Sequence, residues 1–391
     1  MSVERRPAAA AIRVHALVDN LRSGGAEFLL ADFADVAGSV GIELSVAALN
    51  SLSQSSPAAA RLAARGVEPE GLGVTGLIGR GELRHVRADL ARRRPDLVHT
   101  HLSAADFLGG IAARSLGIPS VTTIHADWWQ ADVRRERLKA WLTARVRRRC
   151  AETVIAVSDS ARSVYLAKGW DVPDHVTVVR NGIVDRSRPG AGAGIRQALG
   201  IRPNELVITA LSKLRPEKNF EASIDAVALL RDRFPAARLV IAGDGPHEGA
   251  VRNHAAAHGD AVLLAGHRED VMELLDATDV LIHPSHFDAF PTTVLEAMAA
   301  SVPVVAAEVG GIPEIVEPDV TGVLVAPPPT ASAFSAALAP LLDDVALRRR
   351  LGAAGRVRFE REFSADAWAR RVRAVYDGVL TGRPVPAPRG R

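Results

Sequence analysis

Short apolar runs rich in Val, Ile and Leu recur along the whole chain, and each is followed by a Gly or polar turn and then by a helical pattern. This alternation is typical of βαβ units, which build parallel sheets. In the first half of the chain it predicts strands over residues 12–18, 44–49, 97–100, 120–124, 153–157 and 176–179. In the second half it predicts strands over residues 206–211, 238–242, 262–265, 280–283, 304–306 and 322–325. The fold class is therefore α/β.

A Pro-, Gly- and Ala-rich segment, residues 189–194, separates the two series of strands. We expect a flexible linker there, because this composition is unfavourable in the interior of a helix or strand. The prediction is an N-terminal domain over 1–188, a second domain over 189–364, and a terminal segment over 365–391. Helices are expected over residues 331–342, 346–360 and 365–379, followed by a frayed tail. Two doubly wound domains of this kind bind ligands at the carboxyl ends of their strands.

The composition of the chain argues against several classes of protein. The chain has 391 residues, of which 48% are hydrophobic and 24% charged, as in ordinary globular proteins. A formal net charge of only +3 argues against a nucleic-acid partner. Cys150 is the only cysteine, which suits a reducing cytoplasm. We expect neither an export signal nor a membrane-spanning segment, because Arg13 interrupts the first apolar run and no apolar stretch approaches about eighteen residues.

A basic segment over residues 133–149 contains eight Lys and Arg residues. Its apolar residues, expected on one face of a helix, are Leu138, Trp141, Leu142 and Val146. Such a helix can lie on anionic lipid. It can equally be a solvated surface helix over an ordinary core stripe. Peripheral contact with a membrane therefore stays open at this stage.

Two glycines, Gly24 and Gly25, lie in the turn between the first predicted strand and the helix that follows it. Glycines let backbone N–H groups approach an anion at the positive end of a helix. An ordinary tight β-to-α turn explains the pair equally well.

Two lysines follow the strand over residues 206–211. Lys213 and Lys218 are five positions apart in one loop, at the carboxyl end of that strand. They can converge on a diphosphate through charge-assisted hydrogen bonds. The alternative is that both are solvated loop charges.

Two carboxylates follow the strand over residues 280–283. Asp288 lies in the loop and Glu296, eight positions later, lies in the next helix, so both can face the ligand side. A carboxylate there can accept hydrogen bonds from a ribose diol or from sugar hydroxyls. Thr292 and Thr293 offer N–H groups at the start of the helix, which is a second candidate anion site. Asp288 could also be an ordinary cap or turn residue.

These segments resemble a known family. Residues 288–296, the following 297–305 and the Gly-Gly-Ile-Pro-Glu run at 310–314 resemble the E-x7-E region and the G-G-x-x-E segment of the retaining glycosyltransferases of family 4. Further segments match in the family's order, and these are residues 95–101, 157–160, 179–183, 242–246 and 265–271. The resemblance covers roughly residues 12 to 365.

The resemblance implies a GT-B fold, with an acceptor-binding N-terminal domain, a nucleotide-sugar-binding C-terminal domain and a last helix that returns to the first domain. It implies a co-substrate, a UDP- or GDP-sugar, and no essential metal. By match to the family motifs, Lys218 holds the donor diphosphate, Glu296 the ribose hydroxyls and Asp288 the transferred sugar. Gly25 would lie under the diphosphate, and His125 near the anomeric carbon. The implied catalytic residues are His125, Asp288 and Lys218. The implied donor-binding residues are Gly24, Gly25, Lys213, Lys218, Asp288, Phe290, Thr292, Thr293 and Glu296.

The chain departs from the family pattern at two places. Lys213 stands where the family usually has Arg, which keeps the charge but loses the bidentate guanidinium. Asp288 is one methylene shorter than the usual Glu, and this leaves the identity of the donor sugar open. No D-x-D motif is present to hold a catalytic metal ion. We expect His99 and His101 to point to opposite faces of their strand, which would make them a poor metal pair.

Two other function classes are weighed against a glycosyltransferase. A nucleotide-sugar or glycan-binding module without turnover is compatible with the unusual Asp288 and Lys213. A dehydrogenase is less compatible, because Pro246 interrupts the Gly-rich segment at 243–249 and its third glycine comes one position late. The acceptor, whether a natural product, a glycan or a lipid, and the oligomeric state are left open by the sequence.

Overall fold

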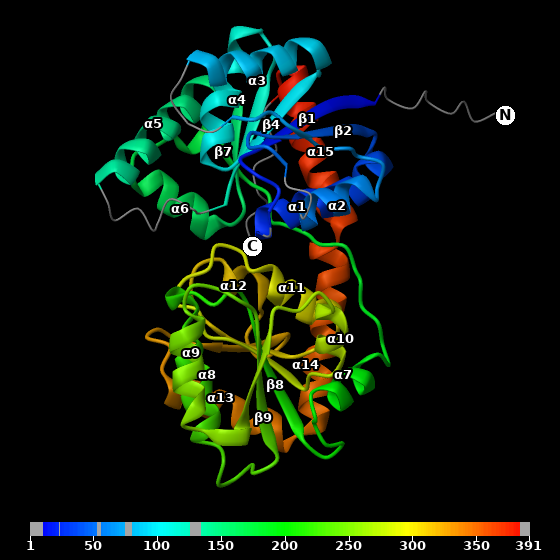
Figure 1. Cartoon of the computed structure of the whole chain (residues 1–391), viewed down its shortest axis with the longest axis vertical. Helices are drawn as coiled ribbons and strands as arrows, with labels where there is room; N and C mark the ends of the chain where they lie inside the picture. Colours follow the sequence, from blue (N-terminus) through cyan, green and yellow to red (C-terminus); the bar gives the residue numbers. More distant parts are fainter. Residues whose placement is uncertain (1–10, 23, 53–55, 75–79, 126–133, 384–391) are drawn as a thin grey trace, which may run out of the picture. The chain divides into compact units, whose positions relative to one another are not determined.

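The computed structural model describes residues 11–22, 24–52, 56–74, 80–125 and 134–383, and the chain divides into two compact units (Figure 1). Unit 1 comprises Met1–Val184 and Ala365–Arg391, and unit 2 comprises Asp185–Ser364. The chain therefore leaves unit 1 at Val184, slightly before the 188/189 boundary expected from the sequence, and returns to it at Ala365.

Unit 1 is built on a seven-stranded parallel sheet with the order β3-β2-β1-β4-β5-β6-β7. Its strands are β1 (Ile12–Val18), β2 (Ile42–Ala48), β3 (Glu70–Gly71), β4 (Leu97–His101), β5 (Ser120–Ile124), β6 (Thr153–Ala156) and β7 (Val176–Val178). Its helices are α1 (Gly25–Val36), α2 (Pro57–Ala63), α3 (Arg80–Arg93), α4 (Ser103–Ser115), α5 (Arg134–Cys150), α6 (Asp159–Ala167) and α15 (Ala365–Thr381). Every residue of β4, β5 and β6 is buried, as in parallel sheets that helices cover on both faces.

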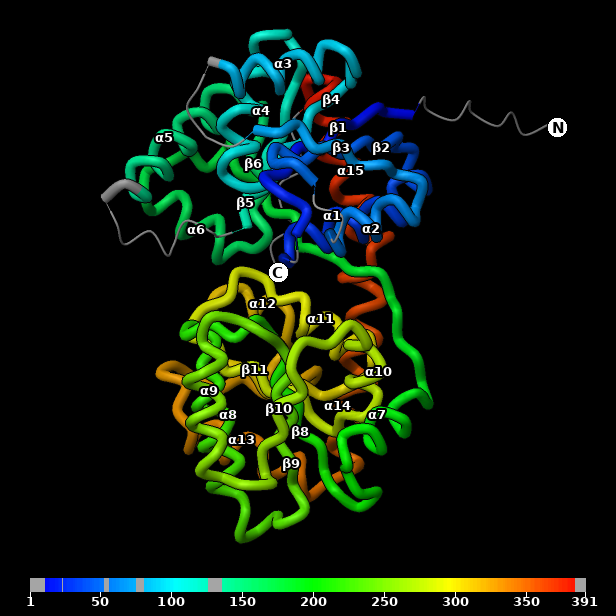
Figure 2. The backbone as a smooth tube through the Cα atoms, viewed as in Figure 1, coloured from blue at the N-terminus to red at the C-terminus, as the bar shows by residue number. Residues whose placement is uncertain are grey.

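The last helix, α15, completes the core of unit 1 although it is far from the rest of that unit in the sequence (Figure 2). The ring of Trp368 packs edge-on against Phe33 of α1, with centroids 5.3 Å apart. The Arg373 guanidinium donates to the carbonyl oxygens of Val40 and Gly41 at 2.7 and 2.8 Å. Removing α15 would thus expose the apolar face of α1.

Unit 2 is built on a six-stranded parallel sheet with the order β10-β9-β8-β11-β12-β13. Its strands are β8 (Leu206–Leu211), β9 (Ala237–Ala242), β10 (Val262–Gly266), β11 (Val280–His283), β12 (Val304–Ala307) and β13 (Gly322–Val325). Its helices are α7 (Gly192–Ala198), α8 (Phe220–Ala228), α9 (Glu248–Ala256), α10 (Val271–Asp276), α11 (Thr292–Ala299), α12 (Ile312–Ile315), α13 (Ala331–Asp343) and α14 (Val345–Arg358). The α/β class and all twelve predicted strands are confirmed, with ends displaced by two residues at most. The two-residue strand β3 carried no apolar run and was not predicted.

The prediction of a flexible linker over residues 189–194 is wrong, because α7 begins at Gly192 inside it. A Cβ on Gly192 would lie 2.5 Å from the backbone nitrogen of Ala277, so this glycine permits close packing of α7 against the end of α10. The Gly192 N–H also donates to the carboxylate of Asp276 at 2.7 Å. Glycine here serves tight packing rather than flexibility.

None of the helices in the described part of the chain combines the length and the apolar character that crossing a bilayer requires.

Candidate active site

Three titratable side chains meet at the carboxyl ends of β8 and β11 in unit 2. Lys218 ends a 3-10 turn, Pro216–Lys218, and its Nζ lies 2.5 Å from Oδ2 of Asp288. The Nε2 of His283, the last residue of β11, lies 3.1 Å from the same carboxylate oxygen. The three side chains are only 18, 15 and 3% exposed for Lys218, Asp288 and His283. The structure thus brings together Lys218 and Asp288, which the sequence places 70 positions apart.

The charges in this cluster stabilise each other. Burial alone would raise the pKa of the Asp288 carboxyl, but the Lys218 ammonium and the hydrogen bond from His283 more than offset it and hold that pKa well below its usual range. Burial lowers the pKa of His283 despite the neighbouring carboxylate. Asp288 is therefore an ionised acceptor at neutral pH, and His283 is a neutral imidazole that donates to it.

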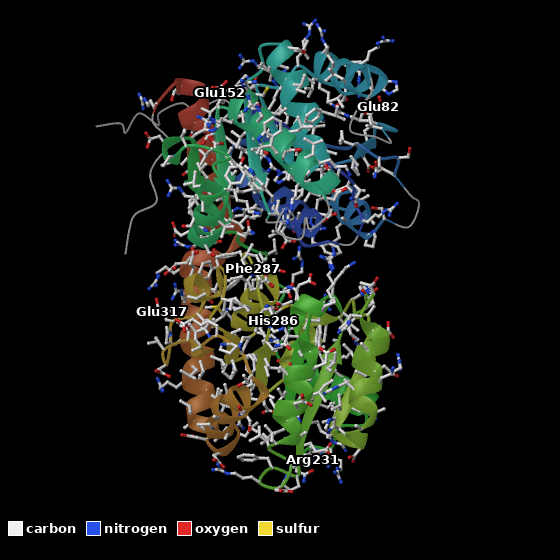
Figure 3. The ribbon with its side chains drawn as sticks, turned by 90° about the vertical axis from the view of Figure 1, so that its left-hand side faces the viewer. Glu82, Glu152, Arg231, His286, Phe287 and Glu317 are labelled. Carbon is white, nitrogen blue, oxygen red and sulfur yellow. The ribbon has the colours of Figure 1, made fainter. Side chains whose placement is uncertain are left out.

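Backbone contacts from two neighbouring segments hold the Asp288 loop. Gly310 has φ +56°, and a Cβ there would collide with the carbonyl oxygen of Asp288. The N–H of Gly311 donates to that same oxygen at 2.9 Å. The loop between His283 and Asp288 is held at its other side, where the His286 N–H donates to the carbonyl oxygen of Glu217 at 2.8 Å. Figure 3 labels His286 and Phe287 of this loop. One backbone hydrogen bond therefore joins the Lys218 loop to the Asp288 loop.

Helix α11 begins directly after this loop. Pro291 occupies its N-cap position, and no side chain at that position caps the first turn. Thr292 is half-buried, and Thr293 places its Oγ1 in the interior without a hydrogen-bond partner among the described residues. Glu296 follows one turn later and is half-buried. First-turn N–H groups of this kind are available to an anion.

The remaining expected donor residues of unit 2 differ in exposure. Lys213 is exposed, in the same loop as Lys218. The ring of Phe290 is 5% exposed and packs edge-on against Phe363, with centroids 5.8 Å apart. Phe290 is thus a core residue that supports the Asp288 loop from inside, which leaves its backbone as the part that can meet a ligand.

In unit 1, the half-buried His125 follows β5 directly and belongs to a cluster with the buried His99 and His101. Its Nε2 lies 3.2 Å from Nδ1 of His101. His99 contacts the hydroxyl of Tyr376 through Nδ1 at 2.6 Å and the hydroxyl of Thr123 through Nε2 at 2.7 Å. The expectation that His99 and His101 point to opposite faces is wrong, because residues two apart in a strand share a face. Their ring centroids lie 4.1 Å apart.

Burial keeps these histidines neutral. It lowers the pKa of His99 and of His125 to about 3, with smaller contributions from neighbouring positive charge, and holds the pKa of His101 well below its usual range. The cluster lines a cavity of about 20 Å³, which is room for about one water molecule. The Nε2 of His101 is buried and has no partner among the described residues.

The glycine turn of unit 1 carries a negative charge of its own. Gly25 is the first residue of α1, and Gly24, in an extended conformation, precedes it. Glu27 is 7% exposed and folds back, so that a Cβ on Gly24 would lie 2.9 Å from its carboxylate carbon. A carboxylate at this place interacts favourably with the helix dipole. It also competes with any anion for the N–H groups of the first turn.

Sequence reasoning missed three contributors to these sites. His283 was read only as the end of a strand, although a polar residue at the carboxyl end of a buried strand is a usable signal. Gly310 was noted for its motif and not for its contact with Asp288. Tyr376 comes from the last helix, and no local pattern predicts its contact with His99.

The comparisons with known proteins agree with this geometry. Residues 23–186 match the model of the family "Glycosyltransferase Family 4", and residues 193–358 match that of "Glycosyl transferases group 1". Glycogen synthase of Mycobacterium tuberculosis is 30% identical over 309 residues, which is 76% of this chain and 72% of the relative. D-inositol 3-phosphate glycosyltransferase of Actinosynnema mirum is 31% identical over 323 residues, 73% of this chain and 74% of the relative.

Among solved structures, Anabaena HepE in complex with UDP-glucose superposes with a TM-score of 0.82 at 21% identity, covering 94% of this chain and 100% of that one. This likeness shows the GT-B fold. The chain belongs to glycosyltransferase family 4. It is a retaining glycosyltransferase that takes its sugar from a nucleotide-sugar donor.

Proposed function

We propose that this enzyme transfers a hexose from a UDP-hexose to a hydroxyl group of a glycan, lipid or natural-product acceptor in the cytoplasm, with unit 2 binding the donor and unit 1 the acceptor. The observation that carries the proposal is the Lys218–Asp288–His283 cluster, at the edge of the sheet where parallel α/β sheets bind ligands. UDP is favoured over GDP because the structural neighbour HepE binds UDP-glucose. Hexosyl transfer is favoured because the relatives include glycogen synthase.

In the proposed donor complex, Lys218 exchanges one anion for another. Without a ligand its ammonium pairs with Asp288 at 2.5 Å. The donor diphosphate replaces that carboxylate on Lys218, and Asp288 then accepts hydrogen bonds from hydroxyls of the transferred sugar. His283 stays behind Asp288 at 3.1 Å and keeps the carboxylate oriented. Lys213, exposed in the same loop, adds positive charge at the entrance of the site.

The start of α11 supplies the rest of the proposed donor site. N–H groups of Thr292 and Thr293 meet a phosphate oxygen, and Glu296 accepts hydrogen bonds from the ribose diol. Gly24 and Gly25 are proposed as further diphosphate-binding residues, as the family motifs imply. For them to bind it, the Glu27 carboxylate must move away from the first turn of α1, because two anions cannot share those N–H groups.

The proposed chemistry proceeds on one face of the sugar. The bond between the anomeric carbon and the phosphate oxygen breaks, and the acceptor oxygen bonds to that carbon from the same side, so the configuration is retained. The departing phosphate takes the acceptor proton. Lys218 and the α11 N–H groups stabilise the negative charge that develops on the diphosphate. Electrostatic stabilisation of this kind is usually the largest single contribution to catalysis. Neutral His125 offers the sugar a hydrogen bond without adding a charge.

A panel of nucleotide sugars tests the proposed donor. A donor present at 100 times its dissociation constant stabilises the fold by about 2.7 kcal/mol, which a melting curve resolves. We expect stabilisation by a UDP-hexose and by UDP, and slow release of UDP from that donor when acceptor is supplied. Stabilisation by GDP-sugars alone would overturn the choice of nucleotide. Tight binding with no turnover on any acceptor would favour the binding-module alternative.

We further propose that α5 of unit 1 rests on anionic phospholipid. Leu138 and Trp141 are 57 and 45% exposed, so the alternative that they belong to a core stripe is wrong for both. A surface hollow of about 450 Å³ lies beside Trp141. It is lined by Trp141, Ala144, Arg145, Arg148, Arg149, Lys168, Gly169 and Trp170. Basic side chains around the exposed Trp141 and the half-buried Trp170 suit a bilayer interface with negative headgroups.

Co-sedimentation with vesicles tests this contact. We expect binding to phosphatidylglycerol vesicles and not to phosphatidylcholine vesicles, and loss of binding in the double variant Arg145→Glu, Arg148→Glu. The exposed Arg84 and Arg87 of α3 give a control of equal charge change that should leave binding intact. Equal loss in both double variants would mean a non-specific charge effect. Binding of an acidic polysaccharide but not of vesicles would also refute the lipid assignment.

A further inference from the structure

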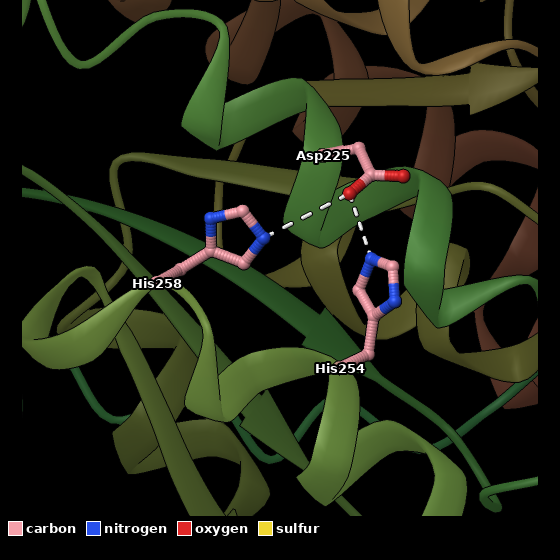
Figure 4. A group of neighbouring side chains, drawn as sticks. All are labelled: Asp225, His254 and His258. Carbon is pink, nitrogen blue, oxygen red and sulfur yellow. Dashed lines mark hydrogen bonds and ion pairs between the residues drawn. The ribbon is translucent and has the colours of Figure 1, made fainter.

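Two histidines and one aspartate of unit 2 meet between α8 and the C-terminal end of α9, and none of them belongs to the cluster of Lys218, Asp288 and His283 (Figure 4). Asp225 belongs to α8 and His254 to the last turn of α9, while His258 follows that helix by two residues. The Nε2 of His254 lies 2.7 Å from Oδ1 of Asp225, and the Nε2 of His258 lies 3.9 Å from the same oxygen. One donor atom from each residue lies within 4.8 Å of the other two.

A hydrogen-bonded pair explains only part of this arrangement. His254 and Asp225 are at hydrogen-bonding distance, but 3.9 Å is too long for a hydrogen bond from His258. His258 nevertheless directs its Nε2 toward the shared oxygen, as Figure 4 shows. Its ring lies 5.9 Å from the ring of His254, tilted by 43°. The hydrogen bond between His254 and Asp225 therefore does not explain why His258 lies so close to both residues.

The three donor atoms are close to the geometry that a transition metal needs. Bonds of about 2.0–2.1 Å to a tetrahedral Zn²⁺ place its ligand atoms about 3.3–3.4 Å apart. The observed 2.7 and 3.9 Å bracket that spacing, so shifts of about half an ångström in each would reach it. Because the three side chains are only half-buried, their rotation is not blocked by a packed core.

We propose that Asp225, His254 and His258 form a Zn²⁺-class metal site that ties α9 to α8. The spacing H-x3-H is one that zinc sites use, and two imidazoles with one carboxylate leave a fourth position for water. The site is separate from catalysis, since the donor is held by lysine and backbone N–H groups. Its effect is on stability: α8 begins two residues after Lys218, so the metal steadies the helix that follows this proposed donor-binding residue and ties it to α9.

The same two helices provide a matched control. The Nε2 of His247, just before α9, lies 2.6 Å from Oε1 of Glu221 in the first turn of α8. This pair has the same chemistry and joins the same helices, but among the residues that the structure describes it belongs to no group of three possible metal ligands. His247→Ala thus breaks a short His–carboxylate contact and leaves every proposed ligand in place. His258→Ala does the reverse, because it removes a ligand and leaves the short pair between His254 and Asp225 intact.

The test compares the full-length wild type with both variants after chelator treatment and desalting. We expect one Zn²⁺ per wild-type chain by dialysis and metal analysis, and a visible d–d spectrum when Co²⁺ is bound. Zn²⁺ at 100 times its dissociation constant should raise the melting temperature of unit 2 by about 5–10 °C in calorimetry. His258→Ala should weaken Zn²⁺ affinity by more than the about 10–100-fold that loss of an outer partner costs. His247→Ala should keep both stoichiometry and shift.

Three results would overturn the proposal. The first is a wild-type chain that takes up no stoichiometric Zn²⁺. The second is a His258→Ala chain with the wild-type affinity, which would place the metal elsewhere. The third is an equal loss of Zn²⁺ affinity in His258→Ala and His247→Ala. It would show that metal binding depends on the packing of α8 against α9 and not on His258 as a ligand. Asp225→Asn, which keeps the shape of the side chain, repeats the ligand test in a variant whose metal-free melting temperature can be matched to that of the wild type.

Discussion

The buried histidines of unit 1 make its stability depend on pH, and His99 gives the cleanest case. Its folded-state pKa is about 3, lowered mainly by burial, and an unperturbed histidine titrates near 6.5. Burial also raises the pKa of Tyr376, so that phenol stays protonated and donates to Nδ1 of His99. The Nε2–H then donates to Thr123 at 2.7 Å. The native state thus has a full set of hydrogen bonds around a neutral ring.

The sign and size of the effect follow from the two pKa values. Below pH 6.5 the unfolded chain binds a proton at this residue and the folded chain does not, so the stability is present above pH 6.5 and is lost as the pH falls. Each pH unit in that range costs about 1.4 kcal/mol for one histidine. Between pH 7 and pH 5, His99 alone should therefore lower the free energy of unfolding of unit 1 by about 2 kcal/mol.

The assay uses His99→Gln, which keeps a donor and an acceptor but cannot titrate. All five tryptophans of the chain, at positions 128, 129, 141, 170 and 368, belong to unit 1, so tryptophan fluorescence in urea follows that unit alone. We expect the wild type to lose about 2 kcal/mol more than the variant between pH 7 and pH 5, because the other titrating groups are common to both. Parallel curves for the two proteins would refute the assignment of a neutral buried His99.

Three further predictions concern the donor and acceptor sites. Glu296→Gln should weaken binding of bare UDP in calorimetry, since a neutral amide accepts poorer hydrogen bonds from a diol than a carboxylate does; unchanged affinity would assign Glu296 to packing of α11. EDTA should leave turnover at 25 °C largely intact, because the proposed donor complex holds the diphosphate through Lys218 and backbone N–H groups; abolition by EDTA with recovery on Mg²⁺ would contradict this account. His125→Ala should lower turnover while UDP affinity stays nearly unchanged, as for an interaction made mainly in the transition state; a lower melting temperature with full activity of the folded fraction would show a structural histidine instead.

Hydrophobic patterning predicted the sheets well because buried parallel strands read as continuous apolar runs. The strand over Val280–His283 was predicted with its exact ends, and so were four others. The prediction of a flexible linker over residues 189–194 failed because glycine occurs both in linkers and where helices pack closely. Gly192 is a case of close packing. The pattern also failed for β3, whose pairing with β2 depends on neighbours and not on its own residues.

The meeting of Lys218 and Asp288 in the proposed donor site was predictable from the sequence, and their further contacts were not. Lys218 and Asp288 were found from their positions after two strands, which meet at one edge of the sheet. The contact of His283 with Asp288, and the use of Gly310 to seat the Asp288 loop, require the fold to be known. The same is true of Phe290, which looked like a ligand contact in the motif and is a core residue in the structure.

The central claim is that Lys218 and Asp288, paired in the free enzyme, separate to hold different parts of one donor. Calorimetric titration of wild type, Lys218→Ala and Asp288→Asn with UDP and with UDP-glucose tests it directly. We expect Lys218→Ala to weaken both ligands, since each presents the diphosphate. Asp288→Asn should weaken UDP-glucose about tenfold or more, the cost of one charged hydrogen bond, while binding UDP at least as tightly as wild type because Lys218 is freed from its partner. Equal weakening of UDP and UDP-glucose by Asp288→Asn, or unchanged binding in Lys218→Ala, would contradict the account.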